Sequence, residues 1–72
     1  MIPLKPRERI VLTFIFEFHA EYKNSPLVSE ITARCQFAGT TVRYVLGRLQ
    51  MKGYIDWVQV GSRRLIVPLW KE

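Results

Sequence analysis

The sequence predicts a small α+β fold in which three helices are followed by a β-hairpin. Apolar residues recur at helical spacing over residues 6–22 and again over residues 31–49, which favours amphipathic helices. After Lys52-Gly53 the pattern changes to an alternation rich in β-branched and aromatic residues, which is typical of strands. A chain of 72 residues has room for one domain, which we expect to span residues 1–72.

The first helix is expected from about residue 6 to residue 22. Pro6 suits the first helical position, where an N–H group is not needed, and Asn24-Ser25-Pro26 ends the helix. Lys5 is a poor N-cap, which predicts fraying at this end. The stripe predicted to face the core consists of Val11, Ile15, Phe18 and Tyr22, flanked by Leu12 and Phe14.

Two further helices are expected over about residues 28–36 and 39–52, joined by a tight turn, with Gly53 as a left-handed stop. Their predicted inward side chains are Ile31, Cys35, Phe37, Val42, Val45, Leu46 and Leu49. The outward positions of the later helix are Thr40, Thr41, Arg43, Tyr44, Gly47 and Arg48. These residue types are cationic, small or able to form hydrogen bonds, as a helix in the major groove of DNA requires.

The hairpin is expected over about residues 54–69. Tyr54–Val60 and Arg63–Leu69 read as strands, and Gly61-Ser62 between them is a two-residue hairpin signal. Pro68 fits near the end of an edge strand, because it cannot donate a ladder hydrogen bond.

Positive charge is concentrated in the second half of the chain. The net charge is +5, and residues 39–67 contain one acidic residue, Asp56, against the basic residues Arg43, Arg48, Lys52, Arg63 and Arg64. Clustered positive charge indicates a polyanionic partner. Ordinary solubilising charge is the alternative interpretation, and charge alone does not decide between them.

Several function classes are disfavoured. Cys35 is the single cysteine and His19 the single histidine, so neither an intrachain disulfide nor a Cys/His metal site is expected, and no nucleophile–base pair suggests catalysis. We expect no cofactor and, in so small a core, no small-molecule ligand. The apolar run at residues 10–18 is too short for a membrane helix, so a cytoplasmic protein is expected.

Four segments carry a resemblance to a known family. They are LKPRERIVLTFIFEF (4–18), SPLVSEI (25–31), TVRYVLGRLQMKGYI (41–55) and VQVGSRRLIVPL (58–69). In their order and residues they resemble the winged helix-turn-helix superfamily, and the amino-terminal half is most similar to the DNA-binding domain of LexA-type repressors. Three residues depart from the pattern. Gln36 replaces the usual turn glycine, so the turn must change its conformation or be strained, and Leu27 and Ala38 replace capping residues.

The resemblance implies a recognition helix whose base-facing and phosphate-facing positions are Thr40, Thr41, Arg43, Tyr44 and Arg48. Thr40, Arg43 and Tyr44, near its start, are expected to contact bases, and Arg48 to contact phosphate. Gly47 either lets the helix approach the groove wall closely or is a tolerated defect costing about 1 kcal/mol relative to alanine.

The resemblance also implies that the hairpin is a DNA-contacting wing. Arg63 and Arg64 match the wing, where arginine is favoured along the backbone or in the minor groove. Adjacent strand residues point to opposite faces of a sheet, so Arg63 and Arg64 are expected on different faces of the hairpin. Gln59 and Ser62 are expected to add phosphate hydrogen bonds.

The resulting prediction is a regulator that binds double-stranded DNA with some sequence preference, more in the manner of a repressor than of an activator. The main alternative is a winged-helix adaptor that binds proteins and not DNA. Binding of single-stranded nucleic acid is a third hypothesis, which requires Tyr44, Trp57 or Tyr54 as exposed stacking platforms.

Surplus apolar residues suggest a homodimer, because apolar surface beyond the needs of a small core often marks a partner surface. The candidate interface residues are Ile10, Phe16, Leu69 and Trp70. The alternative is that Phe16, Trp57 and Trp70 cover one another.

Overall fold

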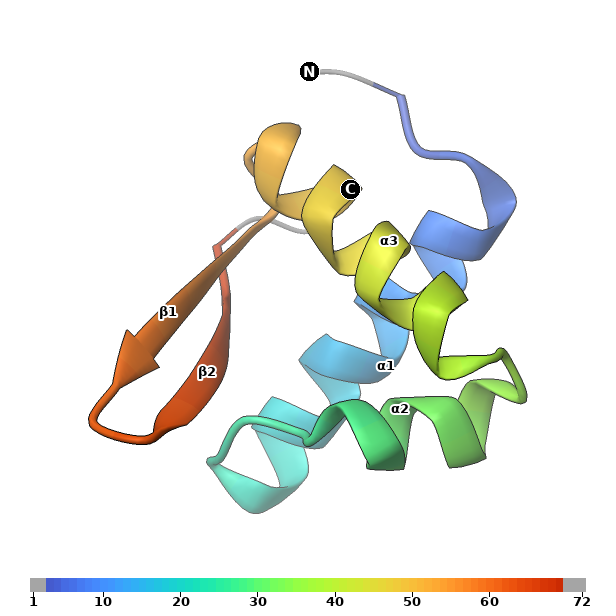
Figure 1. Ribbon diagram of the computed structural model, residues 1–72. Coiled ribbons are helices and arrows are strands. Elements are labelled where there is room, and N and C mark those ends of the chain that lie inside the picture. Colours follow the sequence, from blue (N-terminus) through green and yellow to red (C-terminus); the bar gives the residue numbers. More distant parts are fainter. Residues whose placement is uncertain (1–2, 70–72) are drawn as a thin grey trace.

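A computed structural model describes residues 3–69. Three helices, α1 (Pro6–Tyr22), α2 (Val28–Cys35) and α3 (Gly39–Met51), are followed by the strands β1 (Ile55–Val60) and β2 (Arg63–Pro68) (Figure 1). The predicted order of three helices and an antiparallel hairpin is confirmed. The helices α2 and α3 each end one residue earlier than expected.

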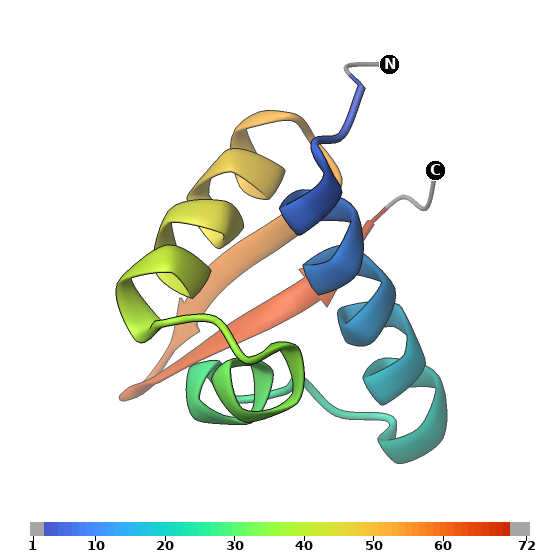
Figure 2. The same cartoon turned by 90° about the vertical axis from the view of Figure 1, so that its right-hand side faces the viewer.

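The helices and the hairpin enclose one apolar core. Figure 2 shows α1 and α3 on opposite sides of the molecule, with the hairpin closing the space between them and α2 below. The core side chains are Leu4, Val11, Leu12, Ile15, Ile31, Val42, Val45, Leu46, Leu49, Tyr54, Ile55 and Ile66. This packing fixes the orientation of α3, which is the element expected to contact DNA.

Glutamates secure the starts of α1 and α2. The Glu8 Oε1 atom accepts a hydrogen bond of 2.9 Å from the Lys5 N–H, and Glu30 Oε1 accepts one of 2.8 Å from the Leu27 N–H. Each glutamate occupies the third helical position, from which a side chain reaches back to the residue before the helix. The expectation of fraying at Lys5 considered the cap residue alone, and the hydrogen bond to Glu8 opposes such fraying.

The buried side of α1 differs from the predicted stripe at two positions. Tyr22 is 59% exposed, although the stripe placed it toward the core, and its ring lies 4.6 Å from that of Phe18. Phe16 was expected to project away from the core, but it is half-buried and packs against it. Because α1 contacts β2 as well as α2 and α3, its buried side is wider than the stripe.

The turn between α2 and α3 is left-handed without glycine. Gln36 has φ 59° and ψ 36°, so the turn keeps the geometry that glycine usually provides and Gln36 bears the strain. The stop after α3 has the expected residue, since Gly53 has φ 85°. These two residues set the angles at which the chain enters and leaves α3.

Candidate nucleic-acid interface

The side of α3 turned away from the core forms an exposed surface that we call the outer face of α3. It consists of Thr40, Arg43, Tyr44, Gly47 and Met51. Tyr44 is 68% and Met51 74% exposed, and Arg43 is also exposed. Met51 was not among the predicted site residues, although its spacing from Thr40, Tyr44 and Gly47 follows one side of a helix. The face offers hydroxyl groups, one guanidinium group and an apolar end.

Gly47 is not required by the fold. A Cβ atom added to Gly47 would meet nothing within 4 Å, and its φ is not positive. Both hypotheses for Gly47 therefore stay open: its place on the outer face of α3 suits close approach of another molecule, and its environment also tolerates a larger residue.

The start of α1 extends the outer face of α3 on one side. A shallow hollow of about 390 Å³ lies there, lined by Lys5, Pro6, Arg7, Glu8, Thr41, Tyr44 and Val45. Lys5 and Arg7 are exposed, and the Arg7 Cζ atom lies 5.9 Å from the centroid of the Phe37 ring. Sequence reasoning missed these two cations because acidic residues balance the charge of the first half of the chain.

Arg48, which was predicted to contact phosphate, forms an ion pair with Glu8. Its Nε atom is 3.6 Å from Glu8 Oε2, and its side chain is 34% exposed. Lys52 Nζ lies 2.5 Å from Glu8 Oε1, and the Lys52 side chain is 6% exposed. We call Glu8, Arg48 and Lys52 the Glu8 cluster. Helical spacing places Arg48 at the edge of α3 that faces α1, where the buried Glu8 carboxylate engages its guanidinium group, and its contact with phosphate stays a prediction.

The charges around Glu8 lower its pKa. Burial of Glu8, a residue that is 3% exposed, opposes the charged form and raises the pKa. The hydrogen bonds from Lys52 and from the Lys5 N–H, together with the charges of Lys52 and Arg48, outweigh burial, so the pKa lies below its usual value. Glu8 is therefore a carboxylate at neutral pH.

The two wing arginines occupy different faces of the hairpin. In the antiparallel register Trp57 lies opposite Ile66 and Gln59 opposite Arg64, so Trp57 and Arg64 share a face. The Arg64 Cζ atom lies 4.3 Å from the Trp57 ring centroid. Arg63 is exposed on the other face.

The turn of the hairpin exposes Ser62 and is supported by Gln59. The Gln59 Nε2 atom donates a 3.3 Å hydrogen bond to the Gly61 carbonyl oxygen, so this amide stabilises the turn. Gly61 adopts φ 63°, a value that two-residue hairpin turns of this kind need. Ser62, at the tip, is exposed.

The hairpin tip reaches the same side of the molecule as α3, as Figures 1 and 2 together show. The segment between α1 and α2 anchors the hairpin: the Ile66 N–H donates a 2.8 Å hydrogen bond to Ser25 Oγ. The outer face of α3 and the start of α1 expose cations beside each other, and the tip of the hairpin extends on the same side of the molecule.

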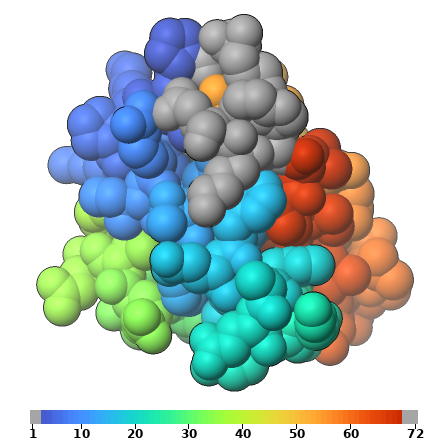
Figure 3. Space-filling view, turned by 180° about the vertical axis from the view of Figure 1, so that it is seen from behind, coloured from blue at the N-terminus to red at the C-terminus, as the bar shows by residue number. Residues whose placement is uncertain are grey.

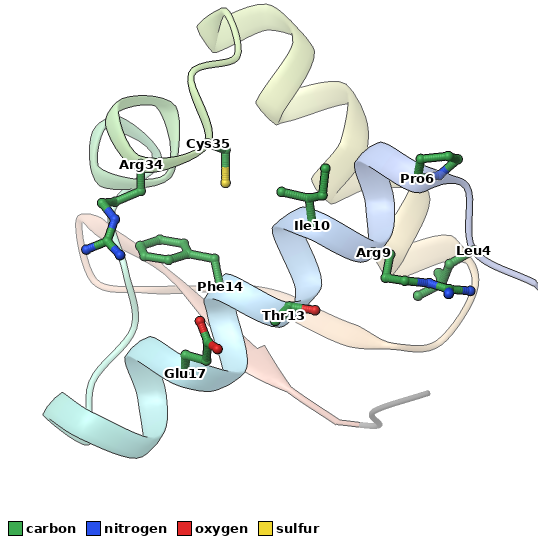
Figure 4. A pocket seen from close by; sticks show the side chains of 9 residues that line it. All are labelled: Leu4, Pro6, Arg9, Ile10, Thr13, Phe14, Glu17, Arg34 and Cys35. Carbon is green, nitrogen blue, oxygen red and sulfur yellow. The ribbon is translucent and has the colours of Figure 1, made fainter.

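The opposite side of the molecule is formed by α1, flanked by the hairpin and by the segment after α2 (Figure 3). A hollow of about 660 Å³ lies between α1 and α2, and Ile10, Phe14 and Cys35 border it (Figure 4). Burial raises the pKa of the Cys35 thiol, and the charge of Arg34 opposes this only in part. Cys35, which was expected among the inward side chains, is half-buried.

Two of the three proposed stacking platforms for single strands are not exposed. Tyr54 is fully buried, and Trp57 is half-buried beneath Arg64. Tyr44 alone among the three presents its ring to solvent, and one ring does not form the succession of platforms that single-strand binding uses.

The helix–turn–helix of α2 and α3, followed by a hairpin whose tip reaches the same side as α3, defines a winged helix-turn-helix protein of the DNA-binding class. Comparison with family models agrees with this class. The model of the LexA DNA binding domain matches residues 1–64, and the chain belongs to this family. A search of curated proteins gave no match. Among residues 3–69, none of the helices is both long and apolar enough to cross a membrane.

Proposed function

We propose that this DNA-binding protein recognises a preferred sequence in double-stranded DNA and acts as a transcriptional repressor in the cytoplasm. The observation that carries the proposal is the outer face of α3, which exposes hydroxyl groups and a guanidinium group beside a wing that carries two more. A helix with such a face fits the major groove, and a wing beside it reaches the adjacent backbone.

The base contacts are assigned to the first two turns of α3. Arg43 has the geometry to donate two hydrogen bonds to guanine, Thr40 offers a hydroxyl and a methyl group, and Tyr44 offers a phenol. Gly47 allows the helix backbone to approach the groove wall. Thr41 borders the hollow shared with Lys5, so its hydroxyl is assigned to phosphate.

The remaining phosphate contacts are assigned to the wing and to the start of α1. Arg63, Arg64 and Ser62 are exposed at the hairpin tip, and Lys5 and Arg7 are exposed beside α3. Contacts of this kind fix the register of the protein on the duplex without distinguishing sequences. Repression then follows from steric exclusion of polymerase from the occupied site.

A homodimer on two half-sites extends the proposal. Ile10 is 50% and Leu69 is 58% exposed, which supports a role for both in a partner surface. Phe16 is half-buried against the core and contributes less to such a surface than the sequence suggested. Trp70 lies outside the described residues.

Selection of binding sites from a random duplex library tests the proposal. An enriched motif, bound more tightly than random duplex and less tightly as salt rises, supports it. A palindromic motif supports the dimer. An adaptor that does not use DNA would enrich no motif and would show no salt-weakened binding to random duplex at low salt, and this result would overturn the proposal.

A further inference from the structure

We propose that Glu8 masks Arg48 from DNA and so limits the part of the affinity that does not depend on sequence. The inference rests on the proposed docking of α3 against a duplex. It assigns to Glu8 the role of a positioning residue, which acts through Arg48 without contacting DNA.

Three groups contact the carboxylate of Glu8. It accepts the Lys5 N–H at 2.9 Å, it contacts Lys52 Nζ at 2.5 Å, and it lies 3.6 Å from Arg48 Nε. Lys52 Nζ also donates a 3.0 Å hydrogen bond to the Pro3 carbonyl oxygen. Lys52 is thus held inside the protein, whereas Arg48 is held at the surface.

Arg48 lies where Glu8 can hold its side chain away from the expected duplex. Arg48 follows Tyr44 by one helical turn, and Glu8, Thr41 and Tyr44 line the same hollow at the edge of the outer face of α3. Its side chain is 34% exposed, so a rotation away from Glu8 would bring the guanidinium group to the side where the duplex is expected.

Release of Arg48 would have a defined effect on binding. A phosphate contact adds affinity for every sequence alike, and each one steepens the dependence of log K on log salt concentration by about 0.9. By holding Arg48, Glu8 leaves the phosphate contacts to Lys5, Arg7 and the wing. The affinity that remains depends more on contacts with bases.

The test measures binding of two duplexes, one of random sequence and one with the selected motif, between about 50 and 200 mM salt. Glu8→Gln removes the charge and keeps an oxygen for the Lys5 N–H. We expect both duplexes to bind more tightly and the slope of log K against log salt concentration to be steeper by about 0.9. The increase in affinity on dilution from about 200 to about 50 mM salt should therefore be about 3-fold larger than in the wild type. The ratio of the two affinities stays unchanged, because a phosphate contact carries no sequence information.

Further variants isolate the role of Arg48. Glu8→Gln leaves Lys52 buried without its partner, so the double variant Glu8→Gln/Lys52→Met removes that charge and protects the fold. We expect it to show the same steeper slope. Adding Arg48→Ala should cancel the change, whereas Arg48→Ala alone should leave the slope of the wild type unaltered.

Glu17→Gln is the matched control, because it makes the same change of charge at an exposed position on the same helix, in the hollow between α1 and α2. It should leave the slope unchanged. The inference is overturned if folded Glu8 variants keep the wild-type slope, if they lose affinity for the selected duplex, or if Arg48→Ala alone lowers the slope. Absence of wild-type binding to either duplex would instead overturn the proposed function.

Discussion

Arg64 and Trp57 lie on one face of the hairpin, with the guanidinium carbon of Arg64 4.3 Å from the centroid of the Trp57 ring. The ring of Trp57 restricts the Arg64 side chain, which is nevertheless exposed to solvent. An ordered cation loses less conformational entropy when it binds phosphate. Trp57 therefore contributes to the wing without having to touch DNA.

Replacing Trp57 with leucine should weaken binding of all duplexes by about 2-fold to 5-fold, because the variant retains apolar packing but loses the cation–π contact, worth about 0.5–1 kcal/mol. Titration of random and selected duplexes measures the effect. In the Arg64→Ala background the Trp57 substitution should have no further effect, and an additive loss would contradict this account.

Arg43→Ala should reduce the preference for the selected motif, since loss of a bidentate base contact costs about 1–3 kcal/mol at that position. Arg64→Ala should weaken random and selected duplexes alike. Comparing the motifs enriched by the two variants distinguishes the roles. An unchanged motif for Arg43→Ala would show that this residue does not contact bases.

Gln36→Gly should stabilise the protein by about 0.5–1 kcal/mol, because glycine adopts the left-handed conformation of the α2–α3 turn without a Cβ penalty. Thermal unfolding should show an increase in Tm of a few degrees. Gln50→Gly, at an exposed helical position, is the control and should lower Tm. A lower Tm for Gln36→Gly would mean that its side chain has a stabilising role.

Gly47→Ala separates the two hypotheses for this glycine. The open space around the position predicts a gain of about 1 kcal/mol in stability. If the outer face of α3 approaches a groove wall, DNA affinity should fall despite that gain. Unfolding and duplex titration of the same sample provide both measurements, and unchanged affinity would identify Gly47 as a tolerated defect.

Acid should destabilise the protein partly through Glu8. Since folding lowers the pKa of Glu8, its contribution to stability is present above the ordinary pKa of 4.5 and is lost as pH falls through the lower value in the folded state. The Tm should therefore decline below about pH 4.5 in the wild type. In Glu8→Gln the decline should be shallower, and an identical pH profile would contradict the assignment.

The helices and the hairpin could be predicted because their signals are local. Pro6 marked the start of α1, Gly53 the end of α3, and Gly61 the turn of the hairpin. Each residue restricts its own backbone or frees it, and neither effect depends on distant parts of the chain. The outward position of Arg43 followed equally from helical spacing.

The Glu8 cluster could not be predicted, because it joins residues 44 apart in the sequence. Spacing along one helix places Arg48 near its edge but does not reveal the carboxylate that faces it from another helix. The partial burial of Phe16 was missed for the same reason, since it depends on how the other elements pack around α1.

The hydrogen bond between the Ile66 N–H and Ser25 Oγ separates an attached base of the hairpin from its tip. At Ile66 the hairpin is attached to the segment between α1 and α2, and the segment from Gln59 to Arg64 extends beyond that attachment. In the proposed complex, the wing residues assigned to phosphate would therefore lie on the part of the hairpin that extends beyond its attachment to the helices.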